Sequence, residues 1–428
     1  MKKVNVLIFP SGAENSINIF DSLKYNIHFE LYGATIKNDH SSYIFDNNHL
    51  SVGDYSIKSS NFIKNFNNLL EKFKIEFIIP THDEIVTFLT KNATKINATI
   101  VASPYETCSV AFSKIKTFEK LKGKNYLPKI YRINDKISYP VFIKPDIGSG
   151  GKGTYLINSE NELKLHCNNN NYLISEYLPG EEFTVDCFTN SNRTLLFCGA
   201  RSRERITSGV SFHSATIPYD KEIEKIAQDL NNVFEFRGLW FFQLKKSKTG
   251  EYKLMEICTR AAGTMALYRQ LGVNFAALSL FDFMGYDVSI LINHNYIELD
   301  RYYKCCYKCN IDYNKVYVDF DDTLIINDKV NTLLIQFLYQ CVNDNKEIFL
   351  LTRHDKNIYT SLKKYKISKN LFSKIIHIDF TKNKVDYVEG DSIYIDNYFA
   401  DRKLVYDKLK IPVFDVDAVE CLISYDRM

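Results

Sequence analysis

The sequence lacks the features that mark several large classes of protein. Its charges nearly balance, with 54 Lys and Arg against 51 Asp and Glu and a net charge of +3, so bulk charge does not favour nucleic-acid binding. No apolar run reaches the roughly 18 residues of a membrane-spanning helix, so no membrane span is expected. The opening stretch MKKVNVLIF has too short an apolar part for a signal peptide. Without an export signal, the ten cysteines predict reduced thiols in a cytoplasmic protein.

The apolar residues that are present, 45% of the chain, form alternating strand and helix patterns near the N-terminus. Residues 4–9, 29–32 and 77–79 are strand-like, and residues 17–23 and 62–73 are helix-like. This alternation predicts an open α/β sheet whose ligand side is formed by the loops that follow the strands. Glu14 and Asp83 are in such loops and are predicted to contact a substrate. The alternative is that they are first-turn acids that cap helices.

A glycine-rich segment separates two short apolar strands at residues 141–143 and 155–157. Its sequence from Gly148 to Gly153 is GSGGKG, and Lys144 precedes it. Glycine permits a positive φ and close approach to a ligand, and successive free N–H groups can bind phosphate oxygens. Lys144 and Lys152 add positive charge. The spacing of a Walker P-loop is absent, so the segment predicts a different phosphate-binding loop, or alternatively a simple hairpin turn.

Three arginines alternate near the end of a predicted strand at residues 195–205. Alternation along one strand would direct Arg201, Arg203 and Arg205 to the same face. The pattern predicts binding of an anionic substrate, with a solvated basic face as the alternative.

Polar side chains follow several buried strands in the last third of the chain. Two carboxylates, two residues apart, follow the strand at 316–318, and like charges this close require a cation or a shared proton. The complete set is Asp319, Asp321, Thr352, Lys384, Asp396 and Asp401. The preceding stretch, 292–313, is polar and predicts a boundary. Its cysteines, Cys305, Cys306 and Cys309, lack the second ligand pair of a zinc site.

The region from Ser113 to Gly285 resembles the ATP-grasp superfamily and, together with residues 1–110, its carbamoyl-phosphate-synthase-like branch. The resemblance implies that Mg²⁺ and ATP are cofactors. The resemblance implies that the ATP phosphates are bound by Lys114, Lys144 and the glycine loop with Gly150, Gly151 and Lys152. It implies that main-chain groups at Glu176 and Leu178 bind adenine and that Glu182 binds ribose. It further implies that Gln243 and Glu256 bind the metal and that Arg260 faces the phosphoryl group. Cys258 stands where the family pattern has asparagine, and a thiol is a poor ligand for magnesium.

Residues 315–428 resemble the haloacid-dehalogenase (HAD) phosphatase superfamily. The resemblance makes Asp319 the nucleophile, Asp321 the general acid and base, and Asp319, Asp321 and Asp396 the magnesium ligands. Thr352 and Lys384 match the second and third motifs, with Lys382 as a rival for the latter. Asp322 replaces the commoner glycine and Asn397 a frequent aspartate. The motifs are too close for a folded cap, so an open site is expected.

The sequence therefore predicts an α/β chain in three parts. These are a Rossmann-like pre-ATP-grasp domain at 1–110, an α+β ATP-grasp domain at 111–300 and a capless HAD Rossmannoid domain at 301–428. We expect a bifunctional enzyme: an ATP-dependent carboxylate–amine ligase whose phosphatase domain removes phosphate from the product or the amine, in a pathway such as polysaccharide biosynthesis. The partners are small molecules, neither nucleic acid nor membrane, and a homo-oligomer is left open. The alternatives are a non-catalytic HAD docking module and a carboxylating or carbamoyl-phosphate-type enzyme.

Overall fold

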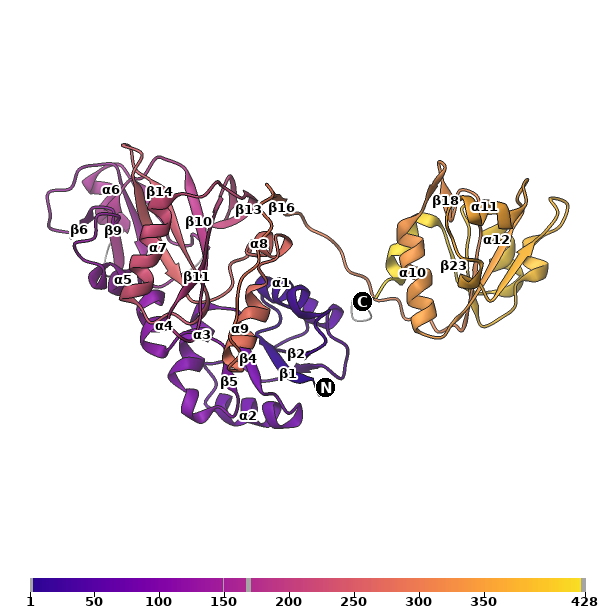
Figure 1. Cartoon of the computed structure of the whole chain (residues 1–428), viewed down its shortest axis with the longest axis horizontal. Helices are drawn as coiled ribbons and strands as arrows, with labels where there is room; N and C mark the ends of the chain where they lie inside the picture. Colours follow the sequence, from indigo (N-terminus) through magenta and orange to yellow (C-terminus); the bar gives the residue numbers. More distant parts are fainter. Residues whose placement is uncertain (1–2, 149, 167–170, 425–428) are drawn as a thin grey trace. The chain divides into compact units, whose positions relative to one another are not determined.

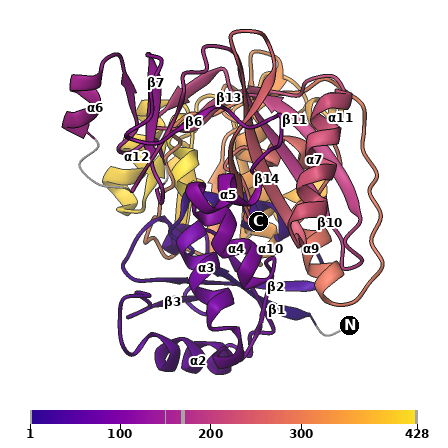
Figure 2. The same cartoon turned by 90° about the vertical axis from the view of Figure 1, so that its left-hand side faces the viewer.

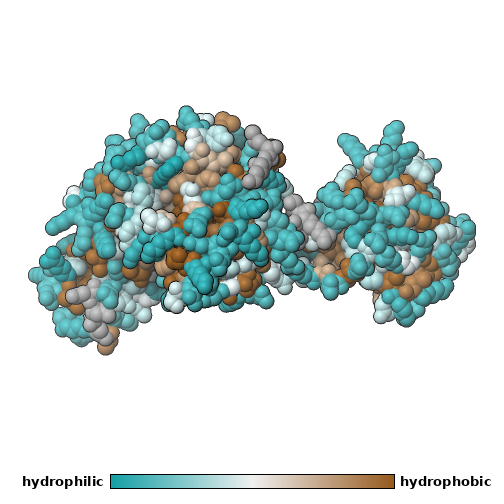
Figure 3. All heavy atoms as spheres, turned by 90° about the horizontal axis from the view of Figure 1, so that it is seen from below, coloured by the Kyte–Doolittle hydropathy of each residue, from teal (hydrophilic) through white to brown (hydrophobic). Residues whose placement is uncertain are grey.

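The computed structural model describes residues 3–148, 150–166 and 171–424 and divides into two compact units, residues 1–303 and 304–428. Each unit has its own sheets and core (Figure 1). On the face drawn in Figure 3, hydrophilic residues cover most of the surface of each unit, and smaller groups of hydrophobic residues lie among these hydrophilic residues. No helix among the described residues is long and apolar enough to cross a membrane.

The first sheet is parallel, with the strand order β3-β2-β1-β4-β5. Its strands are Leu50–Val52, Phe29–Thr35, Val4–Phe9, Phe77–Pro80 and Thr99–Ile100 in that order. Alternate residues of β1 enter different cores: Val6 and Ile8 pack with α1 (Glu14–Leu23) and α9 (Phe275–Phe283), whereas Leu7 and Phe9 pack with α2 (Phe62–Lys72) and α3 (Asp83–Lys91). Burial on both faces explains why these strands are almost wholly apolar.

The order of this sheet reverses between β1 and β4, and the crevice at such a reversal is the usual ligand site of an open α/β sheet. Helix α1 begins at Glu14 after β1, and α3 begins at Asp83 after β4. The two predicted substrate contacts are therefore first-turn residues of helices as well as neighbours of the crevice.

Among its described residues, the first unit also contains three antiparallel sheets. The largest, β11-β10-β14-β15, comprises Leu195–Ser202, Glu182–Thr189, Gly238–Lys246 and Tyr252–Cys258. Helix α7 (Lys221–Val233) covers one of its faces (Figure 2), where Ile226 and Leu230 pack with Val185 and Phe242. The second, β6-β9-β7-β8, comprises Ile130–Tyr131, Tyr172–Glu176, Val141–Pro145 and Tyr155–Ile157. The third, β12-β13-β16, comprises Arg205–Thr207, Val210–Ala215 and Glu298–Asp300.

One predicted strand is wrong. The segment 195–205 is two strands, because β11 ends at Ser202 and β12 begins at Arg205 in a different sheet. Arg201, Arg203 and Arg205 consequently do not share one strand face. The remaining helices of this unit are α4 (Tyr105–Phe112), α5 (Lys114–Lys120), α6 (Glu160–His166) and α8 (Ala266–Gln270), with short 3-10 turns at His40–Tyr43 and Ala93–Lys95.

The second unit contains a five-stranded parallel sheet in the order β21-β20-β17-β22-β23. The strands are Lys374–His377, Glu347–Thr352, Lys315–Val318, Ser392–Ile395 and Val413–Phe414. A small hairpin, β18 (Ile325–Ile326) and β19 (Lys329–Val330), follows β17 closely. The helices are α10 (Thr332–Asn343), α11 (Ile358–Lys364) and α12 (Phe399–Leu409), and the 3-10 turns are Lys369–Leu371, Lys384–Tyr387 and Val416–Leu422. The mixed α/β class predicted from the sequence is confirmed.

Candidate active site

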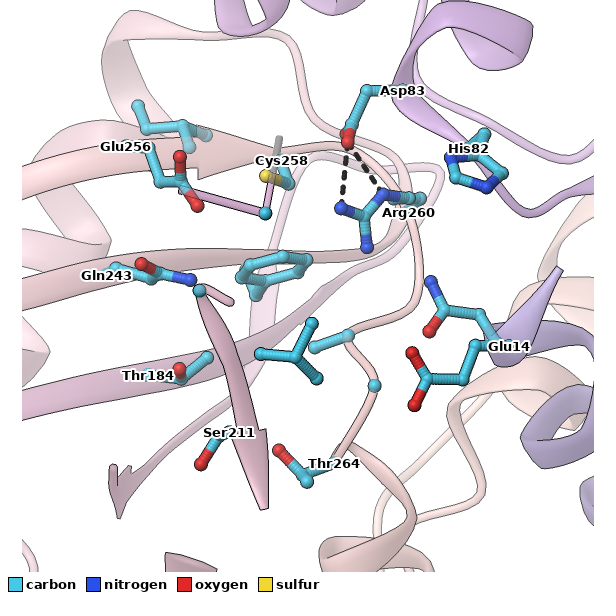
Figure 4. A pocket seen from close by; sticks show the side chains of 18 of the residues that line it. Glu14, His82, Asp83, Thr184, Ser211, Gln243, Glu256, Cys258, Arg260 and Thr264 are labelled. Atoms are coloured by element: carbon cyan, nitrogen blue, oxygen red, sulfur yellow. Dashed lines mark hydrogen bonds and ion pairs between the residues drawn. The ribbon is translucent and has the colours of Figure 1, made fainter. Parts of the chain in front are cut away.

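A pocket of about 210 Å³ opens at the β1/β4 crevice of the first unit. The first turns of α1 and α3 provide Glu14, His82 and Asp83, and the antiparallel sheet provides Gln243 and Glu256 from the other side (Figure 4). Residues more than 150 positions apart in the chain therefore line one cavity. The pocket brings predicted substrate and metal residues together, while their roles stay predictions.

Asp83 and Arg260 form a half-buried ion pair at this pocket. The Asp83 carboxylate lies 2.8 Å from both Nε and Nη2 of Arg260, and Arg260 Nη1 donates to the carbonyl of Ala261. Burial and the Arg260 charge lower the pKa of His82, which keeps that imidazole neutral. The guanidinium is fixed at the edge of the pocket, where Figure 4 shows it beneath the Asp83 carboxylate.

Gln243 and Glu256 are direct cross-strand partners on β14 and β15. Both side chains line the pocket, with Cys258 further along β15. Burial raises the pKa of the Cys258 thiol far above its usual value, and the carboxylates of Asp83 and Glu256 add to the effect. The thiol therefore stays neutral, which makes it a poor ligand for a hard cation.

A second pocket, of about 310 Å³, shares Lys114, Gly150, Gln243 and Glu256 with the first. Its other lining residues include Lys144, Gly151, Lys152 and Glu182, so the residues assigned to phosphates, ribose and metal surround one space. Lys144 is buried and donates to the Met255 carbonyl at 3.2 Å. Burial lowers the pKa of Lys144 to about 8, against the opposing charge of Glu256.

The glycine loop contacts Lys114 on one side and the β12–β13 turn on the other. Lys114 Nζ donates to the Gly148 carbonyl at 3.2 Å, and Gly150 and Gly151 both have φ near 66°. Ser149 lies outside the described residues. At Gly209, in the β12–β13 turn, a Cβ atom would lie 2.6 Å from the Gly150 carbonyl carbon. This hairpin contact, which needs glycine on both sides, could not be found from sequence periodicity.

Arg203 connects that hairpin to the predicted ribose-binding acid. Its Nε donates to Glu182 Oε1 at 2.7 Å, and its Nη2 donates to the Gly209 carbonyl at 3.0 Å. Lys245 Nζ lies 3.5 Å from the other Glu182 oxygen. Two cations thus hold the Glu182 carboxylate at the pocket wall.

Arg201 and Arg205 do not form the predicted anion-binding face, because each is paired with a carboxylate of the chain. Arg201 is buried, and its Nε and Nη2 donate to Asp186 at 2.6 and 3.2 Å. Arg205 is exposed and paired with Asp300. Arg301 pairs with Glu14 and lines the pocket, but no sequence pattern predicts this role, because Arg301 lies in the polar stretch at 292–313.

The two predicted adenine-hinge residues, Glu176 at the end of β9 and Leu178 after it, do not line either of the two described pockets. The Glu176 carboxylate accepts a hydrogen bond from the Lys129 backbone N–H at 2.8 Å, and Leu178 is buried. Their assignment concerned main-chain groups, and it stays a prediction.

In the second unit, Lys384 lies at the centre of three carboxylates. Its Nζ lies 2.7 Å from both Asp319 Oδ1 and Asp396 Oδ2, and 3.9 Å from Asp401 Oδ2. Burial raises the pKa of Asp319 to about 6, with Lys384 opposing the shift. Tyr394 donates its hydroxyl to Asp396. The cluster lies at the β17/β22 switch point of the sheet.

Two further predicted residues lie at the same strand ends. The Thr352 hydroxyl is buried and has no hydrogen-bond partner within the described part of the chain. Asp321, in contrast, turns to His354, whose Nδ1 lies 2.7 Å from Asp321 Oδ2. The predicted three-carboxylate metal set of Asp319, Asp321 and Asp396 is therefore not gathered around one point.

Neither unit contains a preformed metal cage: across the described residues, no group of three His, Cys, Asp or Glu side chains is arranged to hold an ion. Gln243 and Glu256 nevertheless offer oxygen atoms on adjacent strands, which suits Mg²⁺ when phosphate and water complete its shell. In the second unit Lys384 contacts one oxygen each of Asp319 and Asp396, which leaves the other oxygen of each carboxylate as a candidate ligand for Mg²⁺. Cys305, Cys306 and Cys309 are exposed free thiols.

Parts of the first unit are similar to known proteins. Residues 168–297 match the family model "ATP-grasp in the biosynthetic pathway with Ter operon", and residues 111–178 match the ATP-binding domain of the carbamoyl-phosphate synthase L chain. The D-alanine–D-alanine ligase of Petrotoga mobilis is 28% identical over 100 residues, which are 21% of this chain and 34% of that protein. The carbamoyl phosphate synthase large chain of Clostridium acetobutylicum is 24% identical over 269 residues, which are 56% of this chain and 24% of that protein. The matches thus span about a third or less of these relatives.

Solved structures share the fold. An N5-carboxyaminoimidazole synthetase from Staphylococcus aureus has a TM-score of 0.55 at 14% identity, covering 68% of this chain and 81% of its own. A biotin carboxylase from Campylobacter jejuni, in complex with an ATP analogue, has a TM-score of 0.55 at 14% identity over 68% and 72%. An L-amino acid ligase from Bacillus licheniformis has a TM-score of 0.51 at 15% identity over 65% and 73%.

Residues 111–297 of the first unit are therefore similar to ATP-grasp and carbamoyl-phosphate-synthase ATP-binding regions. Both family matches end by residue 297, before the second unit begins at residue 304. The predicted HAD identity of the second unit therefore depends on its own residues.

Proposed function

We propose that the first unit is an ATP-dependent carboxylate–amine ligase. The observation that carries the proposal is that two pockets share Gln243 and Glu256. One contains the glycine loop and lysines, and the other opens into the crevice of the parallel sheet. This arrangement supports a reaction in which ATP binds in the pocket that contains the glycine loop and its terminal phosphate faces a second substrate in the crevice.

The reaction proceeds in two steps that consume one ATP. A carboxylate oxygen of the substrate attacks the γ-phosphorus of ATP, and the bond from that phosphorus to the bridging oxygen breaks. The products of this step are an acyl phosphate and ADP. An amine nitrogen then attacks the acyl carbon, the carbon–oxygen bond breaks, and phosphate leaves as the nitrogen loses a proton. Lys144 and Arg260 stabilise the charge on the transferring group, and the glycine loop excludes water. Mg²⁺, held by Gln243 and Glu256, would neutralise phosphate charge.

The test is ADP release by the purified chain against pairs of carboxylic acids and amines, with the amide product identified by mass spectrometry. Lys144→Ala should abolish release. Lys124→Ala is the matched control, because Lys124 pairs with Asp229 outside the pocket and should leave release unchanged. Unaltered ADP release in Lys144→Ala would overturn the assignment. ADP release that requires bicarbonate but no amine would favour the carboxylating alternative.

We propose that the second unit is a phosphomonoesterase of HAD type. The supporting observation is the convergence of Asp319, Asp396 and Asp401 on Lys384 at the switch point. In the proposed reaction an Asp319 oxygen attacks the phosphorus, the bond to the leaving oxygen breaks, and Asp321 gives that oxygen a proton. Water then attacks the aspartyl phosphate, returns a proton to Asp321, and releases phosphate. Asp319 and Asp396 would hold Mg²⁺, which lets two anions approach.

Hydrolysis of p-nitrophenyl phosphate in the presence of Mg²⁺ tests this second activity. Asp319→Asn should remove it, whereas Asp322→Asn, at an exposed position three residues after the nucleophile, should not. If the wild type and Asp319→Asn behave alike, the unit is the non-catalytic docking module instead. Coupling of the two activities is tested with a phosphorylated amine: the amide should lose its phosphate in the wild type and keep it in Asp319→Asn.

A further inference from the structure

Three large exposed aromatic side chains of the second unit lie within four residues of the carboxyl end of a strand. Phe380, Tyr398 and Phe399 expose 62%, 57% and 67% of their surface. Phe380 follows β21, and Tyr398 and Phe399 follow β22. Because the carboxyl ends of parallel strands meet at one edge of a sheet, these rings lie at the edge that carries Asp319, Thr352 and Asp396. Single exposed rings need no explanation, but a group beside a reactive cluster does. We call these three residues the aromatic rim.

Hydrogen bonds fix the rim to the predicted phosphatase residues. The Tyr398 backbone N–H donates to Asp396 Oδ1 at 2.7 Å. Phe399 begins α12, and Arg402 of that helix donates to the Asp396 carbonyl at 2.6 Å while its guanidinium lies 5.8 Å from the Phe399 ring centre. Two of the three rings are thus anchored within three residues of the same aspartate.

Phe380 is anchored on the opposite side of the cluster. The Ile378 N–H donates to the Thr352 carbonyl at 3.0 Å, which continues the β20–β21 pairing to within two residues of Phe380. Arg353 Nε donates to the Lys382 carbonyl at 3.1 Å on the far side of Phe380. The rim therefore approaches the site from two strands, one on each side of β17 and β20.

The direction of the proposed reaction brings the leaving group to this rim. Asp319 is only 5% exposed, so it attacks phosphorus from the floor of the site. In-line displacement places the leaving oxygen opposite the attacking one, which points the leaving group outward. We propose that the aromatic rim is a specificity surface that stacks on a planar ring in the leaving group, so that the substrates are phosphomonoesters of aryl alcohols or of nucleosides. This inference depends on the proposed phosphatase activity.

The test compares ring-bearing and ring-free phosphomonoesters with the full chain. The substrates are p-nitrophenyl phosphate, adenosine 5′-monophosphate and glycerol 1-phosphate. We expect Tyr398→Ala and Phe399→Ala each to raise KM for a ring-bearing substrate about tenfold, the scale of one base–aromatic stack, with kcat unchanged. KM for glycerol 1-phosphate should stay the same, and Tyr398→Phe should retain the wild-type KM. A raised KM for p-nitrophenyl phosphate alone would indicate recognition of aryl alcohols, and a raised KM for adenosine 5′-monophosphate alone would indicate recognition of nucleosides.

Tyr406→Ala is the matched control, since Tyr406 lies on the same helix, is 50% exposed and is further from the strand ends. If rim variants weaken all three substrates equally, or if Tyr406→Ala has the same effect, the ring-stacking inference is wrong while the phosphatase stands. If the wild type cleaves no phosphomonoester, the proposed activity fails first and the inference fails with it.

Discussion

The buried Arg201–Asp186 pair provides a direct test of whether Arg201 binds substrate or holds the fold. Both side chains are at most 1% exposed, and Arg201 also donates to Thr264. Removing one partner leaves an uncompensated buried charge, which costs about 3–5 kcal/mol. We therefore expect Arg201→Met to destabilise the first unit by this amount.

The change is large enough to measure by calorimetry. A unit of 303 residues has an unfolding entropy of about 0.6 kcal/mol/K, so the midpoint of its transition should fall by about 5–8 °C. Arg205→Met is the control, because its pair with Asp300 is exposed and such pairs contribute little. The double variant Asp186→Leu/Arg201→Met removes both charges and should regain most of the stability.

The opposite pattern would refute this reasoning. If Arg201→Met melts like the wild type but loses ligase activity, Arg201 serves the substrate and the ion pair is incidental. If the double variant is no more stable than Arg201→Met, the uncompensated charge is not the cause of the loss.

Three further outcomes follow from the ligase site. Gly209→Ala places a Cβ atom 2.6 Å from the Gly150 backbone and should therefore raise KM for ATP. Gly250→Ala is the control and should leave KM for ATP unchanged, because Gly250 also has a positive φ but a Cβ atom there would have nothing within 4 Å. Burial lowers the pKa of Lys144 to about 8, and in the proposed reaction its ammonium form binds phosphate, so kcat/KM for ATP should fall as pH rises through about 8. In Lys144→Arg, which stays charged, the fall should disappear. Cys258→Asn replaces a neutral thiol with an oxygen donor and should lower the Mg²⁺ concentration for half-maximal ligation; an unchanged requirement would show that position 258 does not face the metal.

The sequence predicted those features that depend on local pattern. The apolar strands at 4–9 and 316–318 are buried on both faces, so their composition alone indicates a parallel sheet. The glycine loop and the β14–β15 hairpin were predicted from neighbouring residues in the same way. In each case the physical cause of the structure lies within about ten residues of the pattern.

Features that depend on distant residues were missed. The alternation of Arg201, Arg203 and Arg205 predicts one strand, but pairing with β13 takes Arg205 into another sheet. Arg301 and Glu14 are 287 positions apart, and no local pattern relates them. The turn of Asp321 toward His354 likewise depends on a side chain from the next strand of the sheet.

The two parallel sheets show why the same topology can serve different chemistry. Each has its first strand beside its fourth, which opens a crevice between their carboxyl ends. In the first sheet the crevice is flanked by helix N-termini whose acids meet arginines from another part of the unit, leaving room for a substrate. In the second, the acids follow the strands directly and share one lysine. Carboxylates held by guanidinium groups are suited to binding, whereas a buried carboxylate beside a single ammonium is suited to attack, and this difference underlies the separate roles proposed for the two units.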